Sequence, residues 1–272
     1  MSKILLCPNP KRDRGCRVTY SVRDMLVGAG GEVEVCTIDD MTADRLRWAD
    51  FAITFGGDGT ILHAARNACA YGVPVLGVNL GHKGFIAELE MRDTDLLKRL
   101  VRGPVRTEKR MMIDVELIRK GSVIYTDFAL NDVVVGSMGR TLPISAYGDE
   151  RKITSFSGDG IIVSTPTGST AYNLSAGGPI LEPDTENIIL TPICPHTLFA
   201  KGFVLSPNRT VTVEVEDFGR KSAFVSTDGA KPVPLEPRDR IVVTRSEKVA
   251  EFIKLTERSF YERVSEKLGD KL

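Results

Sequence analysis

The sequence predicts an α/β domain with a mostly parallel sheet, then an all-β, sandwich-like domain, and a C-terminal helix that packs back on the first domain. Strand-like and helix-like segments alternate over the first hundred residues, as they do in a parallel sheet covered by helices. After Pro104, short β-rich segments follow one another, separated by glycine, proline and aspartate, which is typical of a sandwich. Phe260, Val264 and Leu268 recur at helical spacing. A helix there needs an apolar partner, which the α/β domain can supply.

The first domain is expected to span residues 1–104. Ile4–Cys7 is a short apolar run that Pro8 ends, so it predicts a strand with a turn behind it. A helix follows, because apolar residues recur at helical spacing from Val18 to Leu26 until the glycines of 28–31 stop it. By the same criteria we expect strands at Val33–Thr37, Phe51–Phe55 and Val73–Val78, and helices at Thr60–Ala70 and Asp93–Arg102.

The second domain is expected to span residues 105–255. Its predicted strands are Met112–Arg119, Ser122–Leu130, Asp132–Gly136, Ile161–Ser164, Thr210–Val215, Ala223–Thr227 and Arg240–Arg245. Thr170–Ala176 is rich in small residues and is expected to form a short helix rather than a strand. Residues 256–272 form the C-terminal segment that returns to the first domain.

The composition is that of an ordinary globular protein. The 272 residues include 36 lysines and arginines and 36 aspartates and glutamates, so the formal net charge is zero. Extended nucleic acid is therefore not an expected partner, whereas a small nucleotide needs only local positive potential. Five scattered cysteines indicate reduced thiols, and three isolated histidines give no zinc pattern. No apolar run is long enough for a membrane span or a signal segment, so we expect a cytoplasmic protein without membrane contact.

The sharpest local motif is Gly56-Gly57-Asp58-Gly59-Thr60, which lies between a predicted strand and a predicted helix. Glycines allow a tight turn and the close approach of a ligand, and the first N–H groups of a helix suit phosphate oxygens. Phosphate repels a carboxylate, so Asp58 is a candidate general base for a hydroxyl that attacks a phosphoryl group. The alternative is a structural turn in which Asp58 or Thr60 caps the helix. The glycine spacing matches neither a P-loop nor a Rossmann fingerprint.

Three further polar segments lie later in the chain. The run Thr165–Pro179 combines short hydroxyl side chains, glycines and Tyr172, a set suited to a purine and its ribose. Asn131-Asp132 offers an amide for an adenine edge and a carboxylate for ribose hydroxyls. The alternative for this dipeptide is a turn between strands. Ser157–Gly160 is likewise a turn, unless a ligand meets Asp159.

Taken in order, Gly56–Thr60, Asn131-Asp132, Gly158–Gly160 and Thr165–Pro179 resemble the motif set of bacterial NAD kinases. The similarity runs from the opening strand to Asp228-Gly229. The first motif is shared with phosphofructokinases and with diacylglycerol and sphingosine kinases, so it indicates only a superfamily, and the long Thr/Tyr/Ser run is the specific one. The resemblance implies transfer of a phosphoryl group from ATP or another donor to the 2′-hydroxyl of the adenosine ribose of NAD.

The resemblance also implies roles for individual residues. Asp58 matches the aspartate that activates the 2′-hydroxyl, and Gly59 would lie against the same ribose. His63 can approach a phosphate or lie in solvent, and Asp159 would meet the nicotinamide end, which a neighbouring subunit can contribute. The expected phosphate-binding residues are Gly56, Gly57 and Thr60. The expected NAD-binding residues are Gly59, His63, Asn131, Asp132, Asp159, Thr170, Ala171, Tyr172, Asn173, Leu174 and Ser175.

Three positions depart from the family's pattern. Asp132 stands where glutamate is frequent, Lys83 where an apolar residue is usual, and Ala230 where glutamine is common. The first change shortens the side chain but keeps the carboxylate. The last removes the side chain that would make a contact from position 230.

The resemblance implies NAD and ATP as substrates and a homodimer or homotetramer. The sequence shows no protein-built metal site, so Mg²⁺ or another divalent cation is expected to arrive with the nucleotide, and no cofactor is expected to stay permanently bound. The preferred donor stays open. Two other functions also stay open: a lipid kinase of the diacylglycerol type, although no basic amphipathic helix is found, and a regulator that binds NAD without turnover, against which Asp58 argues.

Overall fold

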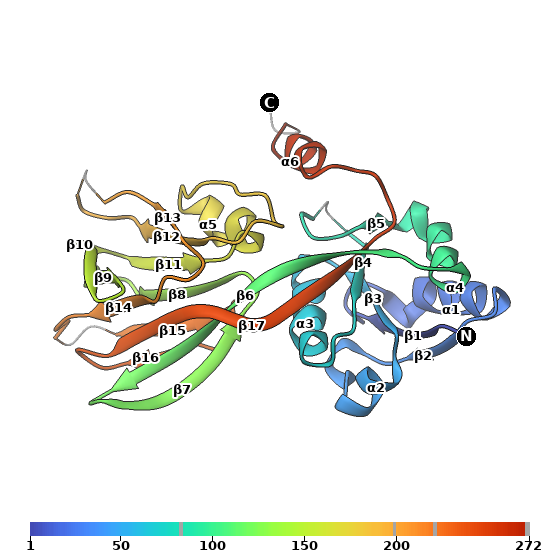
Figure 1. Ribbon diagram of the computed structural model, residues 1–272, viewed down its shortest axis with the longest axis horizontal. Helices are drawn as coiled ribbons and strands as arrows, with labels where there is room; N and C mark the ends of the chain where they lie inside the picture. Colours follow the sequence, from blue (N-terminus) through green and yellow to red (C-terminus); the bar gives the residue numbers. More distant parts are fainter. Residues whose placement is uncertain (82–83, 198–199, 220–221, 270–272) are drawn as a thin grey trace. The chain divides into compact units, whose positions relative to one another are not determined.

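The computed structural model describes residues 1–81, 84–197, 200–219 and 222–269. The chain divides into two compact units (Figure 1): unit 1 is Met1–Lys109 with Val249–Leu272, and unit 2 is Arg110–Lys248. Both boundaries fall inside long strands, β6 (Arg106–Arg119) and β17 (Arg240–Lys254). The chain therefore passes between the units within regular strands.

Unit 1 contains the predicted parallel sheet. Its strands lie in the order β2-β1-β3-β4, with bounds Glu32–Val35, Lys3–Pro8, Phe51–Gly56 and Val75–Asn79. The end of β17 pairs in parallel with β4 through Phe252 and Val75, and the two-residue strand β5 (Leu89–Glu90) also pairs with β4. The chain goes from β1 outward to β2 and then back past β1 to β3. The carboxyl ends of β1 and β3 thus flank the point where ligands commonly bind in such sheets.

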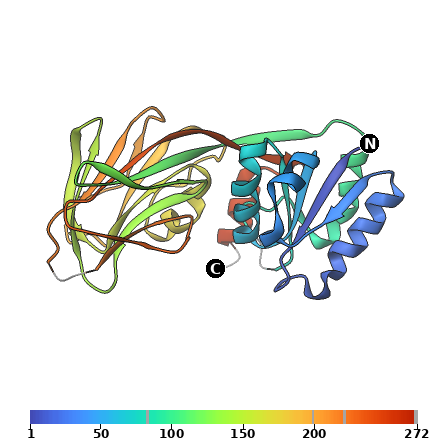
Figure 2. The ribbon, with the colours of Figure 1, turned by 90° about the horizontal axis from the view of Figure 1, so that it is seen from below.

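Helices cover both faces of this sheet (Figure 2). Helix α1 (Arg17–Gly28) and the segment η4–α4, a 3₁₀ helix at Met91–Lys98 followed by α4 at Arg99–Arg102, share an apolar core with β1, β3 and β4. Helix α3 (Asp58–Ala68) buries Ile61 and three alanines and contacts β3 and β4. A Cβ on Gly77 of β4 would lie 2.3 Å from Ile61 Cδ1, so the glycine allows this close packing.

Two helical segments of unit 1 differ from the prediction, and the two-residue strand β5 was not predicted either. Asp93–Arg102 was expected to be one helix, but most of it is 3₁₀, because the buried Leu97 and Leu100 are three residues apart and a 3₁₀ turn stacks that spacing equally well. Helix α2 (Ala43–Trp48) was not predicted. Only Leu46 of its six residues is buried, so its sequence has no periodic apolar face. Short 3₁₀ turns lie at Arg14–Cys16, Ile38–Asp40 and Cys69–Tyr71.

Unit 2 is the predicted sandwich of antiparallel strands. One layer contains β6, β7 (Ser122–Ala129), β9 (Leu142–Gly148), β10 (Arg151–Gly158), β14 (Val211–Val215) and β17. The other has the order β13-β12-β11-β8-β15-β16, with bounds Phe203–Leu205, Ile188–Ile193, Gly160–Ser164, Asp132–Ser137, Ala223–Thr227 and Val233–Leu235. A single apolar cluster takes side chains from both layers, including Val115, Ile144 and Val213 from the first and Val135, Val163 and Val225 from the second.

Five strands of unit 2 were not predicted, and their sequences explain why. Strand β10 lies at the end of its sheet and exposes charged residues such as Arg151 and Lys152, so its apolar pattern is weak. All six residues of β12 are buried, so no alternation appears, and Pro192 lies inside it. Strand β9 contains Pro143, and β13 and β16 have three residues each. The predicted short helix near Thr170 is present as a 3₁₀ turn (Thr167–Thr170) followed by α5 (Tyr172–Ser175).

The C-terminal helix α6 (Phe260–Gly269) belongs to unit 1, as predicted, and its start is a capping box. The Ser259 Oγ accepts the N–H of Glu262, and the Glu262 carboxylate accepts the N–H of Ser259. The buried residue of this helix is a cation, Arg263, whereas Phe260 and Val264 are half-buried and Leu268 is exposed. No helix in the described ranges is long and apolar enough to cross a membrane.

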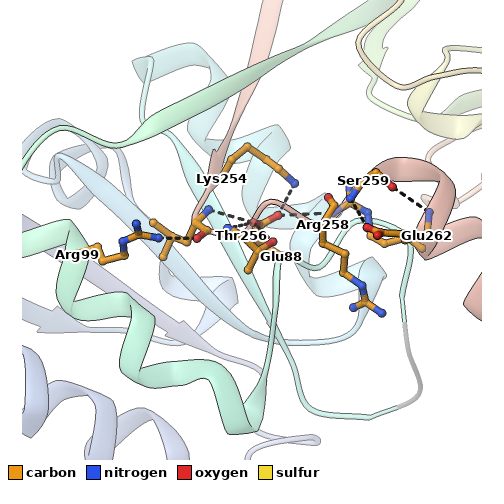
Figure 3. Close-up of polar contacts among 9 residues, drawn as sticks. Glu88, Arg99, Lys254, Thr256, Arg258, Ser259 and Glu262 are labelled. Atoms are coloured by element: carbon orange, nitrogen blue, oxygen red, sulfur yellow. Dashed lines mark hydrogen bonds and ion pairs between the residues drawn. The ribbon is translucent and has the colours of Figure 1, made fainter.

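The segment before α6 is held by the buried carboxylate of Glu88 (Figure 3). Glu88 Oε1 accepts the N–H of Leu255 at 3.0 Å, the N–H of Thr256 at 2.8 Å and the Thr256 hydroxyl at 2.7 Å. Glu88 Oε2 pairs with Lys254 and, at 3.7 Å, with Arg263. Burial lowers the pKa of Lys254, and the charge of Glu88 opposes that shift. One carboxylate thus compensates two shielded cations.

Glu88→Gln is expected to lower the free energy of unfolding of unit 1 by about 3 kcal/mol, because it removes the negative charge that pairs with Lys254 and with the buried Arg263. Trp48, the single tryptophan, lies in unit 1, so its fluorescence during urea unfolding measures the change. Glu257→Gln, at an exposed position of the same segment, is the control and should have no effect. Equal unfolding midpoints for the two variants would contradict this account of Glu88.

Candidate active site

The turn between β3 and α3 places the Gly56–Thr60 motif at the carboxyl end of the parallel sheet. Gly57 is the N-cap residue of α3 and has extended dihedral angles, and no side chain caps the helix. A Cβ on Gly56 would lie 2.4 Å from Thr60 Oγ1, so only glycine fits beside Thr60. The Thr60 N–H donates to Gly57 O at 2.9 Å, and no described side chain covers the N–H groups of Asp58 and Gly59 at the start of the helix.

Asp58 is the first residue of α3, but its carboxylate does not cap the helix. It accepts the N–H of Phe85 at 2.8 Å and the N–H of Ile86 at 3.2 Å. Gly84 packs against it so closely that a Cβ there would lie 1.9 Å from Asp58 Oδ1. Lys267 of α6 lies 3.9 Å from Asp58 Oδ2. The side chain of Asp58 is 31% exposed, so the carboxylate is fixed by its neighbours and still reachable.

A pocket of about 350 Å³ lies in unit 1 beside this turn. Thr60 Oγ1 accepts a hydrogen bond from Asn9 Nδ2 at 2.9 Å, and the Asn9 N–H donates to Phe55 O, which ties the ends of β1 and β3 together. The lining contains polar, apolar, basic and acidic residues: Asn9, Pro10, Lys11, Ile38, Asp39, Gly59, Thr60 and His63. From the sequence we expected only a turn from Pro8 to Pro10 and no role for Lys11, because nothing local distinguishes these residues from ordinary turn residues.

In unit 2, the carboxylate of Asp228 organises the Asn131-Asp132 segment. It accepts three consecutive backbone N–H groups: those of Leu130 at 2.8 Å, Asn131 at 2.7 Å and Asp132 at 3.0 Å. The Asp228 N–H donates in return to Asp132 O at 2.9 Å. Sequence reasoning noted Asp228 only at the end of the similar region. No sequence pattern shows that a residue about a hundred positions away holds this segment.

The start of the Thr165–Pro179 run packs against the same segment. Strands β8 and β11 are antiparallel with Asp132 opposite Ser164, so the end of one lies beside the start of the other. The Thr165 N–H donates to Asn131 O at 2.9 Å, and a Cβ on Gly168 would lie 2.1 Å from that oxygen. The structure thus brings together two motifs that the sequence separates. Within the described residues, the buried Oδ1 atom of Asn131 has no hydrogen-bond partner, so it can accept one from a ligand.

Asp132 is a buried carboxyl group with 5% of its surface exposed. Burial, and then the charge of Asp228, raise its pKa to about 7. A carboxyl group with such a pKa changes charge near neutral pH, a property common at functional sites.

The loop from Thr170 to Ser175 presents a mixed surface. Tyr172 is 46% exposed, Ser175 is exposed, and Thr170, Ala171 and Leu174 are half-buried. Asn173 is fully buried: its Nδ2 donates to Ser169 O and Pro179 O, and its Oδ1 accepts the Thr191 hydroxyl. The Asn173 side chain therefore holds the loop closed, and its neighbours form the accessible surface.

The structure does not bring every predicted residue together. Asp159 is exposed and precedes β11, whereas Thr165 follows that strand, so the two lie about 20 Å apart along it at about 3.3 Å per residue. Ala230 lies in the turn that carries Asp228, where its carbonyl accepts the Ser226 hydroxyl. Lys83 lies outside the described residues. Among the described residues, no group of three or more His, Cys, Asp or Glu could hold a metal ion.

The chain matches two family descriptions over most of its length. Residues 13–105 match "ATP-NAD kinase N-terminal domain", and residues 109–255 match "ATP-NAD kinase C-terminal domain". Among similar proteins, the NAD kinase of Caldanaerobacter subterraneus subsp. tengcongensis is 35% identical, with all of both chains covered. The NAD kinase of Heliobacterium modesticaldum is 42% identical, over 83% of this chain and 80% of the relative.

Two solved structures have the same fold. The crystal structure of yeast NADH kinase with NADH has a TM-score of 0.82 at 22% identity and covers 100% of this chain and 88% of that one. The structure of an NAD kinase from Archaeoglobus fulgidus in complex with ATP has a TM-score of 0.75 at 27% identity and covers 98% and 97%. With both domain descriptions matched and full-length relatives above 30% identity, the chain belongs to the NAD kinase family.

Proposed function

We propose that this protein transfers a phosphoryl group from ATP or another donor to the 2′-hydroxyl of the adenosine ribose of NAD, giving NADP. The observation that carries the proposal is the carboxylate of Asp58, held by the N–H groups of Phe85 and Ile86 at the end of β3. A binding protein gains nothing from a fixed carboxylate beside a phosphate-binding turn. A kinase needs one to accept the proton of the attacking hydroxyl.

Asp58 is the general base and takes the proton of the 2′-hydroxyl as it attacks. Gly59 lies against the same ribose. Gly56, Gly57 and Thr60 face the donor phosphates, because the glycine turn leaves backbone N–H groups for phosphate oxygens. His63 contacts a phosphate, which its place in the lining of the 350 Å³ pocket supports.

NAD binding falls to the second group of residues. Asn131, with its buried and unpartnered Oδ1, pairs with the adenine edge, and Asp132 accepts hydrogen bonds from ribose hydroxyls. Thr170, Ala171, Tyr172, Leu174 and Ser175 line the nucleotide site, and Asn173 supports their loop. Asp159 meets the nicotinamide end from a second copy of the chain in a homodimer or homotetramer. This is supported by the position of Asp159, which lies at the opposite end of β11 from Thr165 and the loop that follows it.

The donor brings Mg²⁺ or another divalent cation with it. Among the described residues no cluster of side chains could hold such an ion, so we expect it to arrive with the nucleotide and to keep most of its water. When bound, the ion neutralises charge on the donor oxygens.

An activity matrix on purified protein tests the function. ATP, other triphosphates and polyphosphate are each combined with NAD, NADH or diacylglycerol in the presence of Mg²⁺. A NADP-specific dehydrogenase should detect product from NAD. Phosphorylated lipid without NADP would establish the lipid kinase instead, and NAD binding without any product would establish the regulator.

Asp58→Asn is expected to lower kcat by roughly 100- to 10,000-fold, because it removes the proton acceptor, while NAD still binds with a similar Kd in calorimetry. Asp44→Asn is a matched control on α2, where the carboxylate is almost fully exposed, and should retain full activity. Near-normal kcat in Asp58→Asn would show that the base is another group.

Gly84→Ala is expected to lower kcat by roughly 100-fold, because the new Cβ would force the Asp58 carboxylate from its place. The Kd for NAD should stay the same. Gly28→Ala is the control, since a Cβ at that helical glycine meets open space. If Gly84→Ala kept full kcat, the position of the carboxylate in this structure would not matter for turnover.

The KM for NAD is expected to fall as pH rises from about 6 to about 8. In the free protein Asp132 has a pKa of about 7, so below that value it is protonated and accepts ribose hydroxyls less well. Above it, the carboxylate is ionised and accepts them fully. Asp132→Asn should flatten this part of the profile. An unchanged slope in that variant would assign the titration to another group.

A further inference from the structure

The C-terminal helix approaches the catalytic carboxylate with charged side chains. Along α6, Arg263 and Lys267 are one turn apart and so lie on the same face. Arg263 has 8% of its side chain exposed and reaches Glu88, while Lys267 reaches Asp58. The two side chains of α6 that reach Glu88 and Asp58 are therefore both cations.

The placement of α6 is determined by fixed contacts before and inside it. The Glu88 carboxylate binds the backbone of Leu255 and Thr256, and Arg99 donates to Leu255 O at 2.7 Å (Figure 3). The Ser259–Glu262 capping box then starts the helix. Glu88 also follows closely after Phe85 and Ile86, whose N–H groups hold Asp58. The same short stretch of chain thus positions both Asp58 and α6.

Two groups, a backbone N–H and an ammonium group, meet at one oxygen of Asp58. Oδ2 accepts the Phe85 N–H at 2.8 Å and lies 3.9 Å from Lys267 Nζ, which in turn is 3.8 Å from the centroid of the Phe85 ring. The ring and the carboxylate both attract the ammonium group. The two charged side chains are about one-third exposed, so water screens their attraction only in part. Burial lowers the pKa of Lys267, and the charge of Asp58 opposes that shift.

The motif around Asp58 supplies no positive side chain of its own. Residues 56–60 contain glycine, aspartate and threonine only, unlike a P-loop, in which a lysine belongs to the turn. The nearby cations Lys254 and Arg263 are paired with Glu88. Within the part of the chain that the structure describes, Lys267 is the ammonium group that pairs with the Asp58 carboxylate.

We propose that Lys267 is a positioning residue of the active site: its ammonium group holds the Asp58 carboxylate against the 84–86 backbone, in the orientation that accepts the ribose proton. The inference rests on the proposed function, because it assigns a second residue to the same step. It connects one residue of α6, far from the glycine turn in sequence, to the proton transfer at Asp58.

The test compares Lys267→Met, which keeps the length and apolar stem, with Lys267→Arg, which keeps the charge. Lys267→Met is expected to lower kcat by about tenfold, as a carboxylate free to turn away would, with KM for NAD and donor within about twofold. Lys267→Arg should restore most of the activity. Lys201→Met and Ser265→Ala, an exposed lysine in unit 2 and an exposed position on α6, are the charge and helix controls and should behave as the parent protein does.

A double-mutant cycle separates positioning from simple support of the fold. In an Asp58→Asn background, Lys267→Met should cause little further loss of kcat, since the charge it orients is already gone. The proposal is wrong if Lys267→Met leaves kcat unchanged, if it raises KM for the donor at constant kcat, or if it lowers activity equally in both backgrounds.

A measurement without substrates distinguishes failure of this inference from failure of the proposed function. The side-chain resonances of Lys267, assigned by comparison with Lys267→Arg, are followed by NMR as pH rises. Replacing Asp58 by Asn should lower the pKa of Lys267, because burial then acts without the opposing charge, whereas Asp44→Asn should not change it. An unchanged Lys267 titration would refute the pair even in an active kinase. A shifted titration in a protein that makes no NADP would leave the pair intact and refute only the function.

Discussion

A buried or half-buried carboxylate needs hydrogen-bond donors, and this requirement organises both units. Asp58 finds the N–H groups of Phe85 and Ile86, Asp228 finds three consecutive N–H groups from Leu130 to Asp132, and Glu88 finds those of Leu255 and Thr256. In each case the carboxylate and the backbone it binds are remote in sequence. Such bonds are stronger than those between neutral groups. They fix loops that apolar packing alone would leave free to move.

Glycines make these arrangements possible by removing side chains at the points of closest approach. The Asp58 carboxylate occupies the space that a Cβ of residue 84 would fill, and the carbonyl oxygen of Asn131 occupies the space that a Cβ of residue 168 would fill. In both cases a Cβ would lie within about 2 Å of an oxygen atom, far closer than van der Waals contact allows. Some glycines of this chain therefore lie where one segment packs closely against another, and not only in turns.

The sequence was sufficient for the elements whose pattern is local. The strands of the parallel sheet, helices α1 and α3 and the turn at Asp58 all follow from apolar runs, helical spacing and glycine. The weakly patterned elements were missed: α2 with one buried residue, β10 with charged residues at an edge, and the wholly buried β12. The contacts of Asp228, Asn9 and Lys267 were also out of reach, because each depends on a partner that only the folded chain brings near. Asn173 shows the converse, since a residue placed in a binding motif by sequence proves to have a fully occupied, buried side chain.

The order of the two units along the chain has a consequence for synthesis on the ribosome. Unit 2 is inserted into unit 1, whose last strand segment and final helix emerge after residue 248. The inserted sandwich can therefore finish folding first, while the opening sheet still lacks Phe252 beside β4 and the whole of α6. A nascent chain that stalls between the two would carry a well-formed sandwich and a sheet in which Val75 of β4 still lacks its partner Phe252. That intermediate is the one that chaperones and proteases would meet.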